Sequence, residues 1–402
     1  MKKVFLVAAA LALTAGPAFA SGYRIPEQSL NATALSNAYV ANTNGADTSY
    51  YNPARMSWME NRWQTDFSLT YINLPSIDYT DNRSVAFNSG SRTENFLMPD
   101  LHVVSPDYHN FRFGFSATCP YGLSKRWDNP YPRATAEEFT LKVYEFNPSV
   151  SYKITDQLSV AAGARMLYSD GKVKSNAFGL GSPAARDLDG DSTDYGYNLA
   201  ISYLPIKDLS LAVTYRSKVN LNIDGNARLT YGPLAYSGYA EVMIPAPAVL
   251  TVGAAYTWNK TTVELAYDKT YWSAYDKLDF NYAYPQAPAF DNPVTKNWSN
   301  SDAYRIGVTH QLNKQWTLMA GFAIDKTPVP ASTLGFELPD SDARLYSIGA
   351  RYQYNDHLAL GAAYLYDDKE SRSVTNSSAT APNGTFDNAA AHMVTLGLRY
   401  DF

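Results

Sequence analysis

The feature that most constrains this chain is the alternation of apolar and polar side chains near its carboxyl end. One set of alternating positions holds His392, Val394, Leu396, Leu398, Tyr400 and Phe402. The positions between them hold Met393, Thr395, Gly397, Arg399 and Asp401. A period of two places the two sets on opposite faces of a β-strand. The chain is therefore predicted to end in a strand with one apolar face.

The same alternation recurs along most of the chain. Segment 239–258 is taken as one strand despite Pro245 and Pro247, because its second half alternates well. This pattern predicts fourteen strands, at residues 63–71, 96–104, 111–117, 140–152, 158–168, 195–203, 209–215, 239–258, 263–267, 304–308, 316–324, 346–354, 358–366 and 392–402.

The links between these strands alternate between short and long. The short links are expected at 105–110, 155–157, 204–208, 259–260, 313–314 and 355–357. The long links are expected at 73–94, 119–138, 170–193, 220–238, 272–303, 326–342 and 367–391. This rhythm is typical of bacterial outer-membrane barrels, which have short periplasmic turns and long extracellular loops. Open sheet edges are costly in hydrocarbon, so residues 63–402 are predicted to form an all-β, 14-stranded antiparallel transmembrane β-barrel.

The amino end and the aromatic content fit this compartment. Lys2 and Lys3, an apolar run and the triplet Ala18-Phe19-Ala20 predict a secretory signal peptide at residues 1–20. The run is too short to span a membrane as a helix. The chain contains 32 Tyr, 17 Phe and 7 Trp, which suits aromatic girdles at the membrane interfaces. A Tyr-rich secreted β-sandwich is the alternative.

The composition argues against several other classes of protein. The net charge of −5 becomes −7 without Lys2 and Lys3, which disfavours a nucleic-acid partner. Cys119 is the single cysteine, so no intramolecular disulfide can form. The five histidines show no spacing typical of a nucleophile or metal site, and no glycine-rich phosphate loop occurs. We therefore expect a protein that is not an enzyme and needs no cofactor or metal.

Residues 21–62 precede the first predicted strand and are rich in Ala, Asn, Ser and Thr. A barrel with an even number of strands begins on the periplasmic side, so this segment could fold up into the lumen as a hatch. A disordered periplasmic tail is the alternative.

Charged residues fall on the inward-facing positions of many predicted strands. A charge facing lipid at mid-depth would cost about 2–4 kcal/mol, so these side chains should point into the lumen. They could line a polar pore, or they could pair with one another and hold the hatch, and a hatch favours pairing. The set comprises Asp66, Arg112, Glu145, Arg165, Arg216, Glu264, Arg305, Arg351 and Arg399.

The third predicted strand is interrupted. Phe111, Phe113 and Phe115 alternate regularly, and then Cys119, Pro120, Tyr121 and Gly122 break the pattern. Proline cannot donate a ladder hydrogen bond, and glycine permits unusual backbone angles. The sequence predicts a weak point in the wall here, although Pro120 could instead begin an extracellular loop.

Several motifs along the chain resemble the FadL/TodX family of outer-membrane transporters. They are the run from Ala38-Tyr39-Val40 to Asn52-Pro53-Ala54, then Tyr121-Gly122-Leu123, Thr214-Tyr215-Arg216-Ser217, Tyr304-Arg305-Ile306 and Pro328-Val329-Pro330-Ala331. The resemblance implies a barrel plugged by a hatch, with Asn52, Pro53 and Ala54 in that hatch. It also implies a hydrophobic pocket and sideways exit at the third-strand kink, Cys119 to Gly122. Implied ligands are long-chain fatty acids or other hydrophobic molecules.

The resemblance also suggests ligand-binding residues. Fatty-acid carriers of the family hold a basic residue where this chain has Ser175, so the charge would have to come from Lys172 or Lys174 nearby, with Phe178 and Leu180 contacting the ligand. Alternatives are uptake of aromatic hydrocarbons, a polar-solute porin, or a barrel used as an adhesin or receptor. Further expected partners are outer-membrane lipid and lipopolysaccharide, and the barrel assembly machinery through the terminal Phe402. A monomer is expected.

Overall fold

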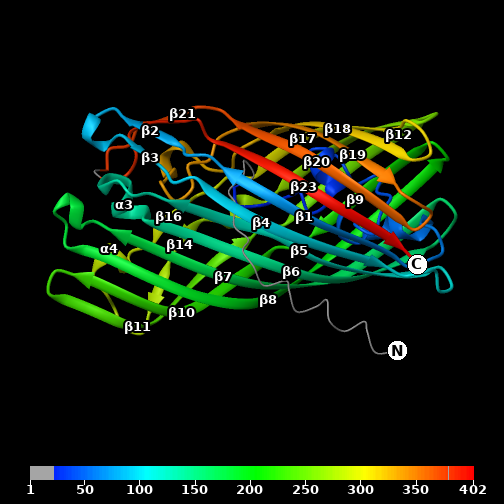
Figure 1. Cartoon of the computed structure of the whole chain (residues 1–402). Coiled ribbons are helices and arrows are strands. Elements are labelled where there is room, and N and C mark those ends of the chain that lie inside the picture. The colour runs from blue at the N-terminus through cyan, green and yellow to red at the C-terminus, as the bar shows by residue number, and fades with distance from the viewer. Residues whose placement is uncertain (1–21, 379) are drawn as a thin grey trace.

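The computed structural model describes residues 22–378 and 380–402, so the predicted signal peptide lies outside the described residues. One large antiparallel sheet closes into a barrel (Figure 1). The first wall strand pairs with the last, from Gln64 opposite Asp401 to Asn73 opposite His392. This pairing removes the open edges that hydrocarbon would penalise.

The wall has fourteen crossings, as predicted. β9 and β10 are two halves of one crossing, β11 and β12 are two halves of the next, and β15 (Phe280–Tyr282) only extends the sheet beside β11. The wall strands are β1 (Gln64–Leu74), β4 (Glu94–Val104), β5 (Phe111–Arg126), β6 (Glu138–Lys153), β7 (Leu158–Asn176), β8 (Ala184–Ile206), β9 (Leu209–Arg216), β10 (Val219–Tyr231), β11 (Leu234–Ala246), β12 (Val249–Trp258), β13 (Thr261–Thr270), β17 (Ser301–Gln311), β18 (Trp316–Asp325), β19 (Ala343–Gln353), β20 (Leu358–Lys369) and β23 (Ala390–Asp401).

Two of the expected long loops are wrong. Residues 170–193 and 220–238 are mostly strand, because β7 and β8 pair up to Asn176 and Ala185 and β10 pairs with β11 over its whole length. Asp187, Asp189 and Asp191 lie on the outward-facing positions of β8 here. Where a strand continues beyond the lipid, its outer face can be polar. Such a segment lacks the alternation of apolar and polar residues by which the strands were predicted.

The end of the barrel opposite the chain's carboxyl terminus carries the other elements (Figure 1). β2 (Asp78–Asp81), β3 (Ser89–Gly90), β21 (Arg372–Val374) and β22 (Gly384–Asp387) form a small sheet, and β14 (Lys277–Leu278) pairs with β16 (Val294–Thr295). The short helices of the loops are η2 (Val85–Phe87), α3 (Pro130–Ala136), η3 (Phe178–Leu180), η4 (Trp272–Ala274), α4 (Pro288–Asp291) and η5 (Ala331–Thr333).

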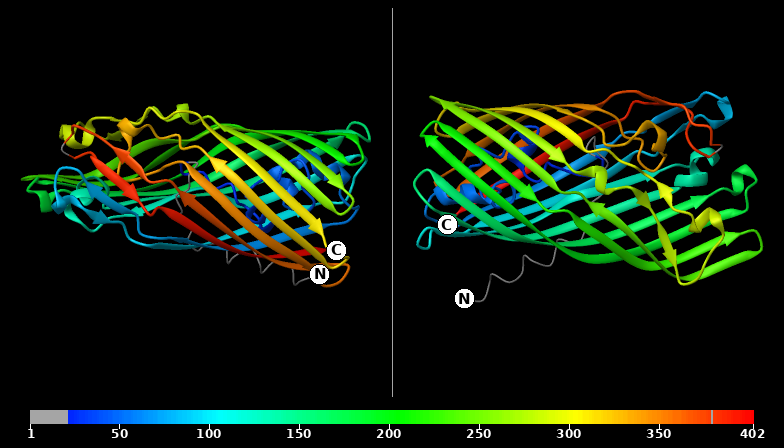
Figure 2. Two further views of the ribbon diagram at one scale, coloured as in Figure 1. Left: turned by 90° about the horizontal axis from the view of Figure 1, so that it is seen from above. Right: turned by 180° about the vertical axis from the view of Figure 1, so that it is seen from behind.

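The residues before β1 lie inside the barrel, where Figure 2 shows them as blue coils within the wall. They contain α1 (Leu30–Ala34), α2 (Thr48–Tyr51) and η1 (Pro53–Trp58). α1 contacts β18, β19 and β20, whereas η1 contacts β6, β7 and β8. α2 contacts β4, β5 and β6, so the hatch, residues 22–62, touches the wall over many neighbouring strands.

Strand alternation separates the two faces of the wall. On β1, Phe67, Leu69 and Tyr71 are exposed on the outer surface, while Ser68 and Thr70 are buried inside. Apolar residues thus face the position of lipid and polar residues face the hatch. Within the described residues, no helix is long and apolar enough to cross a membrane.

Candidate functional site

A network of ion pairs in the wall holds the hatch through hydrogen bonds. Asp66 accepts hydrogen bonds from Arg351 Nη1 at 2.9 Å and from Arg399 Nε at 3.0 Å. It also accepts from the backbone N–H of Ala46 in the hatch at 3.1 Å. Arg351 in turn donates to Asn31 of α1. A single wall carboxylate therefore links β1, β19 and β23 to two parts of the hatch.

The other predicted inward charges also find partners. Glu264 accepts from the backbone N–H groups of Val40, Ala41 and Asn42 at 2.6, 2.6 and 3.0 Å. Glu145 pairs with Arg165 and Arg216. Arg305 pairs with Asp268 and Asp325 and also donates to Ser36 O of the hatch. Arg112 donates to the carbonyl oxygens of Met59 and Glu60. The preference for pairing over pore lining is confirmed.

The Asn52-Pro53-Ala54 turn connects α2 to η1. Asn52 Nδ2 donates to Val40 O at 2.6 Å and to Ser202 Oγ of β8 at 2.8 Å. Proline begins η1, where its missing N–H costs nothing. The turn is therefore one of the places where the hatch is attached to the wall.

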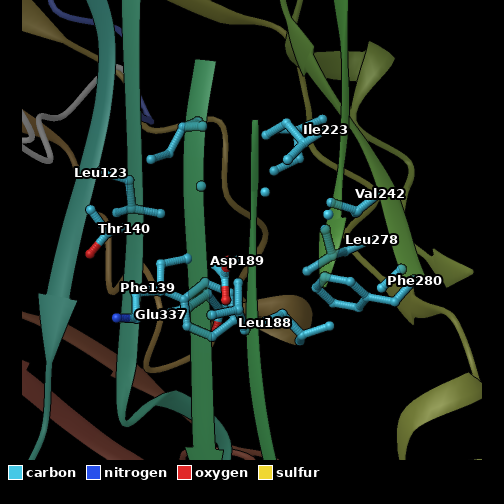
Figure 3. A pocket seen from close by; sticks show the side chains of 18 of the residues that line it. Leu123, Phe139, Thr140, Leu188, Asp189, Ile223, Val242, Leu278, Phe280 and Glu337 are labelled. Carbon is cyan, nitrogen blue, oxygen red and sulfur yellow. The ribbon is translucent and has the colours of Figure 1, made fainter. Parts of the chain in front are cut away.

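An apolar cavity lies on the extracellular side of the hatch (Figure 3). Its empty volume, including the open space at its mouth, is about 810 Å³. Its apolar side chains include Leu123, Phe139, Leu188, Ile223, Val242 and Phe280. This apolar lining suits a hydrophobic molecule.

A row of small residues makes room for this cavity. Gly171, Gly190, Gly225 and Ala240 are paired across β7, β8, β10 and β11, and all four line the cavity. A Cβ on Gly225 would lie 2.1 Å from Asp189 O, whereas one on Gly171 would meet only the side chain of Ile223 at 3.3 Å. Neighbouring strands can therefore approach closely at Gly225, and the missing side chains leave the space open.

The structure brings only one of the four predicted ligand-binding residues to this cavity. Lys172 is part of the lining. Lys174 pairs with Asp187 at 3.0 Å. Phe178 and Leu180 lie in η3 at the tip of the β7–β8 hairpin, 51% and 40% exposed, and neither is a lining residue.

Two cations missed by the sequence reasoning lie near the outer part of the cavity. Arg186 is directly opposite Ser175, donates to Ser175 Oγ at 3.1 Å, and has its guanidinium carbon 5.3 Å from the centroid of the Phe280 ring. Lys296 lines the cavity and pairs with Glu337. Burial would raise the pKa of Glu337, but the charge of Lys296 and its hydrogen bond hold that pKa below the usual value. Two cations therefore share one ionised carboxylate.

These cations were missed because both lie in segments assigned to loops. Arg186 belongs to an Asp- and Gly-rich stretch whose only large apolar side chain, Leu188, does not make an alternating pattern. The cross-strand pairing with Ser175 is the signal that would have identified Arg186, and it depends on the register of β7 and β8.

The wall has a gap at the predicted kink. β4 and β5 pair only from Leu101 opposite Ala117 to Val104 opposite Gly114. Farther out, no ladder joins Glu94–Asp100 to β5, and β5 shifts its register against β6 between Thr118 and Tyr121. β5 itself continues to Arg126, so Pro120 does not begin a loop.

The amino-terminal part of the hatch covers this gap from inside. Ile25 N donates to Pro120 O at 2.8 Å, and Gly122 N donates to Tyr23 O at 2.9 Å. The amide of Gln28 accepts from Cys119 N at 2.6 Å and donates to Cys119 O at 3.0 Å. Tyr23 is also part of the cavity lining. A few residues of the hatch therefore separate the cavity from the gap.

Comparison with known proteins identifies the family. The sequence profile of the outer membrane protein transport proteins (OMPP1/FadL/TodX) matches residues 11–402. The chain is 26% identical over 416 residues to a long-chain fatty acid transport protein of Escherichia coli O6:H1, covering 90% of this chain and 91% of the other. It is 24% identical to outer membrane protein P1 of Haemophilus influenzae, covering 99% and 98%.

Solved structures show the same fold. A Pseudomonas aeruginosa FadL homologue aligns with a TM-score of 0.83 at 20% identity, over 95% of this chain and all of the other. The Pseudomonas putida toluene transporter TodX aligns with a TM-score of 0.70 at 17% identity, over 92% and 98%. Since the family profile covers nearly the whole chain, this protein belongs to the OMPP1/FadL/TodX family of transport proteins of the bacterial outer membrane.

Proposed function

We propose that this protein takes up long-chain fatty acids, holding them in the apolar cavity and releasing them sideways through the gap between β4 and β5. The observation that carries the proposal is an apolar cavity with two cations near its outer part, while Asp189, Asp224 and Glu241 also belong to its lining. Arg186 and Lys296 together face one carboxylate, Glu337. A fatty acid has complementary chemistry, because its tail needs apolar walls and its carboxylate needs a cation.

The sideways route is supported by the chemistry of the lumen. Below the cavity, the space between hatch and wall is lined by polar residues such as Asn31, Glu264 and Arg351. An apolar tail would find no favourable surface there. The gap lies next to Tyr23, which also lines the cavity, so the path through the wall begins directly at the cavity.

An aromatic hydrocarbon is the second candidate. Phe139, Phe280 and Trp298 present aromatic rings to the cavity, and a neutral ligand would need no cation. The two candidates therefore differ in their dependence on Arg186. A polar-solute porin is disfavoured by the hatch inside the lumen.

The first test measures ligand binding to purified protein. Arg186→Gln should weaken oleate binding about tenfold, as expected for loss of a charge-assisted hydrogen bond. It should leave binding of oleyl alcohol unchanged. Lys174→Gln is the matched control, because Lys174 already pairs with Asp187. Lys172→Gln asks whether the lysine in the lining contributes as well.

Equal loss for oleate and oleyl alcohol would show that the substitution damages the cavity rather than removing a carboxylate partner. Unchanged oleate binding in all three variants, together with strong toluene binding, would favour the hydrocarbon.

The second test closes the gap. Replacing Pro120 by Thr and Gly122 by Val favours regular strand pairing. Uptake of labelled oleate by a deletion strain should fall while heat-modifiable mobility shows an intact barrel. Normal uptake in a variant whose β4 and β5 pair without interruption would point to a route past the hatch.

A further inference from the structure

We infer that the inner end of the gap holds a transit site for an uncharged head group that can donate a hydrogen bond, such as an alcohol or a protonated carboxylic acid. This inference rests on the proposed function, and it assigns the site to Asp100 and His102 of β4 and Ser116 and Thr118 of β5. None of these residues belongs to the cavity described above.

The four side chains lie together where the ladder between β4 and β5 ends. His102 and Ser116 are directly opposite each other, and Leu101 with Ala117 is the last pair toward the gap. Asp100 and Thr118 are the next residues beyond that pair. All four lie on the lumenal face, with exposed fractions of 0%, 0%, 0% and 3% for Asp100, His102, Ser116 and Thr118. Residues opposite one another on one face of a sheet are within contact distance.

Each of the four presents a polar atom without a protein partner. Within residues 22–378 and 380–402, these atoms are Asp100 Oδ1, His102 Nδ1, Ser116 Oγ and Thr118 Oγ1. The other oxygen of Asp100 accepts from Ser68 Oγ at 3.3 Å. Buried polar atoms normally have partners, so such a cluster at one place points to an external polar group.

The unpartnered atoms select the chemistry of that group. His102 Nε2 lies 2.9 Å from Gln28 O, and a carbonyl can only accept, so Nδ1 of the neutral ring is an acceptor. Asp100 adds a carboxyl oxygen, and its other oxygen accepts from an uncharged hydroxyl, that of Ser68. A head group that donates a hydrogen would be held, whereas an anionic carboxylate would meet another carboxyl group.

Among the described residues, no cation pairs with Asp100, and Arg24 of the hatch, which lies opposite Tyr121 of β5, is paired with Asp268. From the hatch, the Tyr50 ring approaches His102 with centroids 6.4 Å apart, and Asp47 is the nearby charged group. On the neighbouring β1, Asp66 is already paired with Arg351 and Arg399. The site therefore suits an uncharged head.

The site lies on the route through the wall. Gln28 bridges the gap, with its Nε2 3.6 Å from Met98 Sδ of β4 and 3.0 Å from Cys119 O of β5. A molecule leaving sideways must replace this bridge, and its head group would then pass the four polar atoms. Moving an unpaired hydroxyl group through an apolar wall is costly. Hydrogen-bond partners in the gap would therefore lower the energy barrier for alcohols and protonated carboxylic acids.

The experiment compares three labelled compounds of one chain length in a deletion strain that expresses the full protein. They are hexadecan-1-ol, which donates a hydrogen bond, its methyl ether, which only accepts, and hexadecane. Asp100→Leu should slow uptake of the alcohol on the order of five- to tenfold and leave the ether and hydrocarbon unchanged. Asp100→Asn, which keeps an acceptor oxygen, should restore most of the alcohol rate.

Ser169→Ala is the matched control, because Ser169 is also a fully buried wall serine with an unpartnered Oγ, but it lies on β7 away from the gap. Equal changes for all three compounds, or none, in a folded Asp100→Leu protein would overturn the transit site. Failure of the wild-type protein to take up any of the three, or oleate, would instead reject the proposed transport function itself.

Discussion

The two halves of the lumen contain cavities of opposite chemistry. The extracellular cavity, about 810 Å³, is lined mainly by apolar side chains. The space on the periplasmic side of the hatch, about 830 Å³, is lined by residues such as Asn44, Gln353 and Arg399. These three also line the open periplasmic mouth. The difference indicates that an apolar molecule is stable in the outer half only, and the gap in the wall adjoins that half.

The two halves are also held together differently. The hatch region depends on buried wall carboxylates that accept hydrogen bonds from the hatch backbone, as Asp66 does from Ala46 N and Glu264 does from Val40 N, with Asp66 also paired to Arg351 and Arg399 of the wall. The outer half depends on apolar and aromatic packing, with Tyr23 surrounded by Trp272, Tyr275 and Trp298 at centroid distances of 4.5, 6.1 and 5.7 Å. Changes to the hatch should therefore alter ion permeability, and changes to the outer half should alter ligand binding.

The largest expected effect follows from deleting residues 21–43. This removes α1 and the backbone N–H groups that bind Glu264, so polar space would extend along the lumen. Single-channel conductance in planar bilayers should rise sharply. Conductance at the intact level in a folded barrel would show that these residues do not block the lumen.

The next effect concerns the ion pairs. Asp66→Ala leaves Arg351 and Arg399 buried without their carboxylate, which should lower the free energy of unfolding by about 3–5 kcal/mol. Asp156→Ala is the control, because Asp156 is 98% exposed and pairs with Lys153 at the surface. Its effect should stay below about 1 kcal/mol. Urea titration followed by tryptophan fluorescence would measure both, and equal losses would contradict the assigned role of Asp66.

A smaller effect is expected where the cavity is filled. Gly171→Leu should weaken oleate binding about tenfold, or ~1.4 kcal/mol, because its side chain would occupy the cavity, and the nearest atom to a Cβ there is Ile223 Cδ1 at 3.3 Å. Gly171→Ala should have a smaller effect of the same sign. Gly225→Ala should instead disturb the wall, since its Cβ would meet backbone atoms. Wild-type binding by a folded Gly171→Leu protein would place the ligand elsewhere.

The smallest expected effect is a pH dependence of the stability of the small sheet formed by β2, β3, β21 and β22. Burial alone would raise the pKa of Asp81, but hydrogen bonds from Arg83 and Tyr79 lower it to about 2. The folded pKa lies below the ordinary value, so the stabilisation is present above about pH 4 and is lost as pH falls toward 2. Hydrogen exchange in β2 and β22 should accelerate over this window, and Asp81→Asn should remove the step. If hydrogen exchange in the Asp81→Asn variant still accelerated over this pH range, another titrating group would be responsible.

The sequence predicted the wall far better than the site. Alternation is set by lipid on one side and a polar lumen on the other, so each crossing could be found from its residues, including the one interrupted at Pro247. The inward charges, such as Glu264 and Arg305, followed from the same rule. The cavity depends instead on which residues meet across strands, as Ser175 meets Arg186, and register beyond the membrane leaves no periodic signal.

The gap was predicted in part. Pro120 and Gly122 marked the place, because these residue types disturb pairing. The residues that cover it, Tyr23 to Gln28, could not be found this way, since their contacts with β5 join distant parts of the chain. Asp100 and His102 were equally hidden, because their significance depends on the ladder ending beside them.

The seam between β1 and β23 has a consequence for the order of assembly. Phe402 donates its N–H to Trp63 O at 2.9 Å, so the ring is completed by two segments that lie far apart in the sequence. The hatch directly precedes β1 and ends up enclosed, so it must enter while the seam is open or rise later through the periplasmic mouth. A chain that stops before Ala390 would have two open edges around its plug. When β1 pairs with β23, the lumen would become closed to ions and the wall would lose its open edges in the same step.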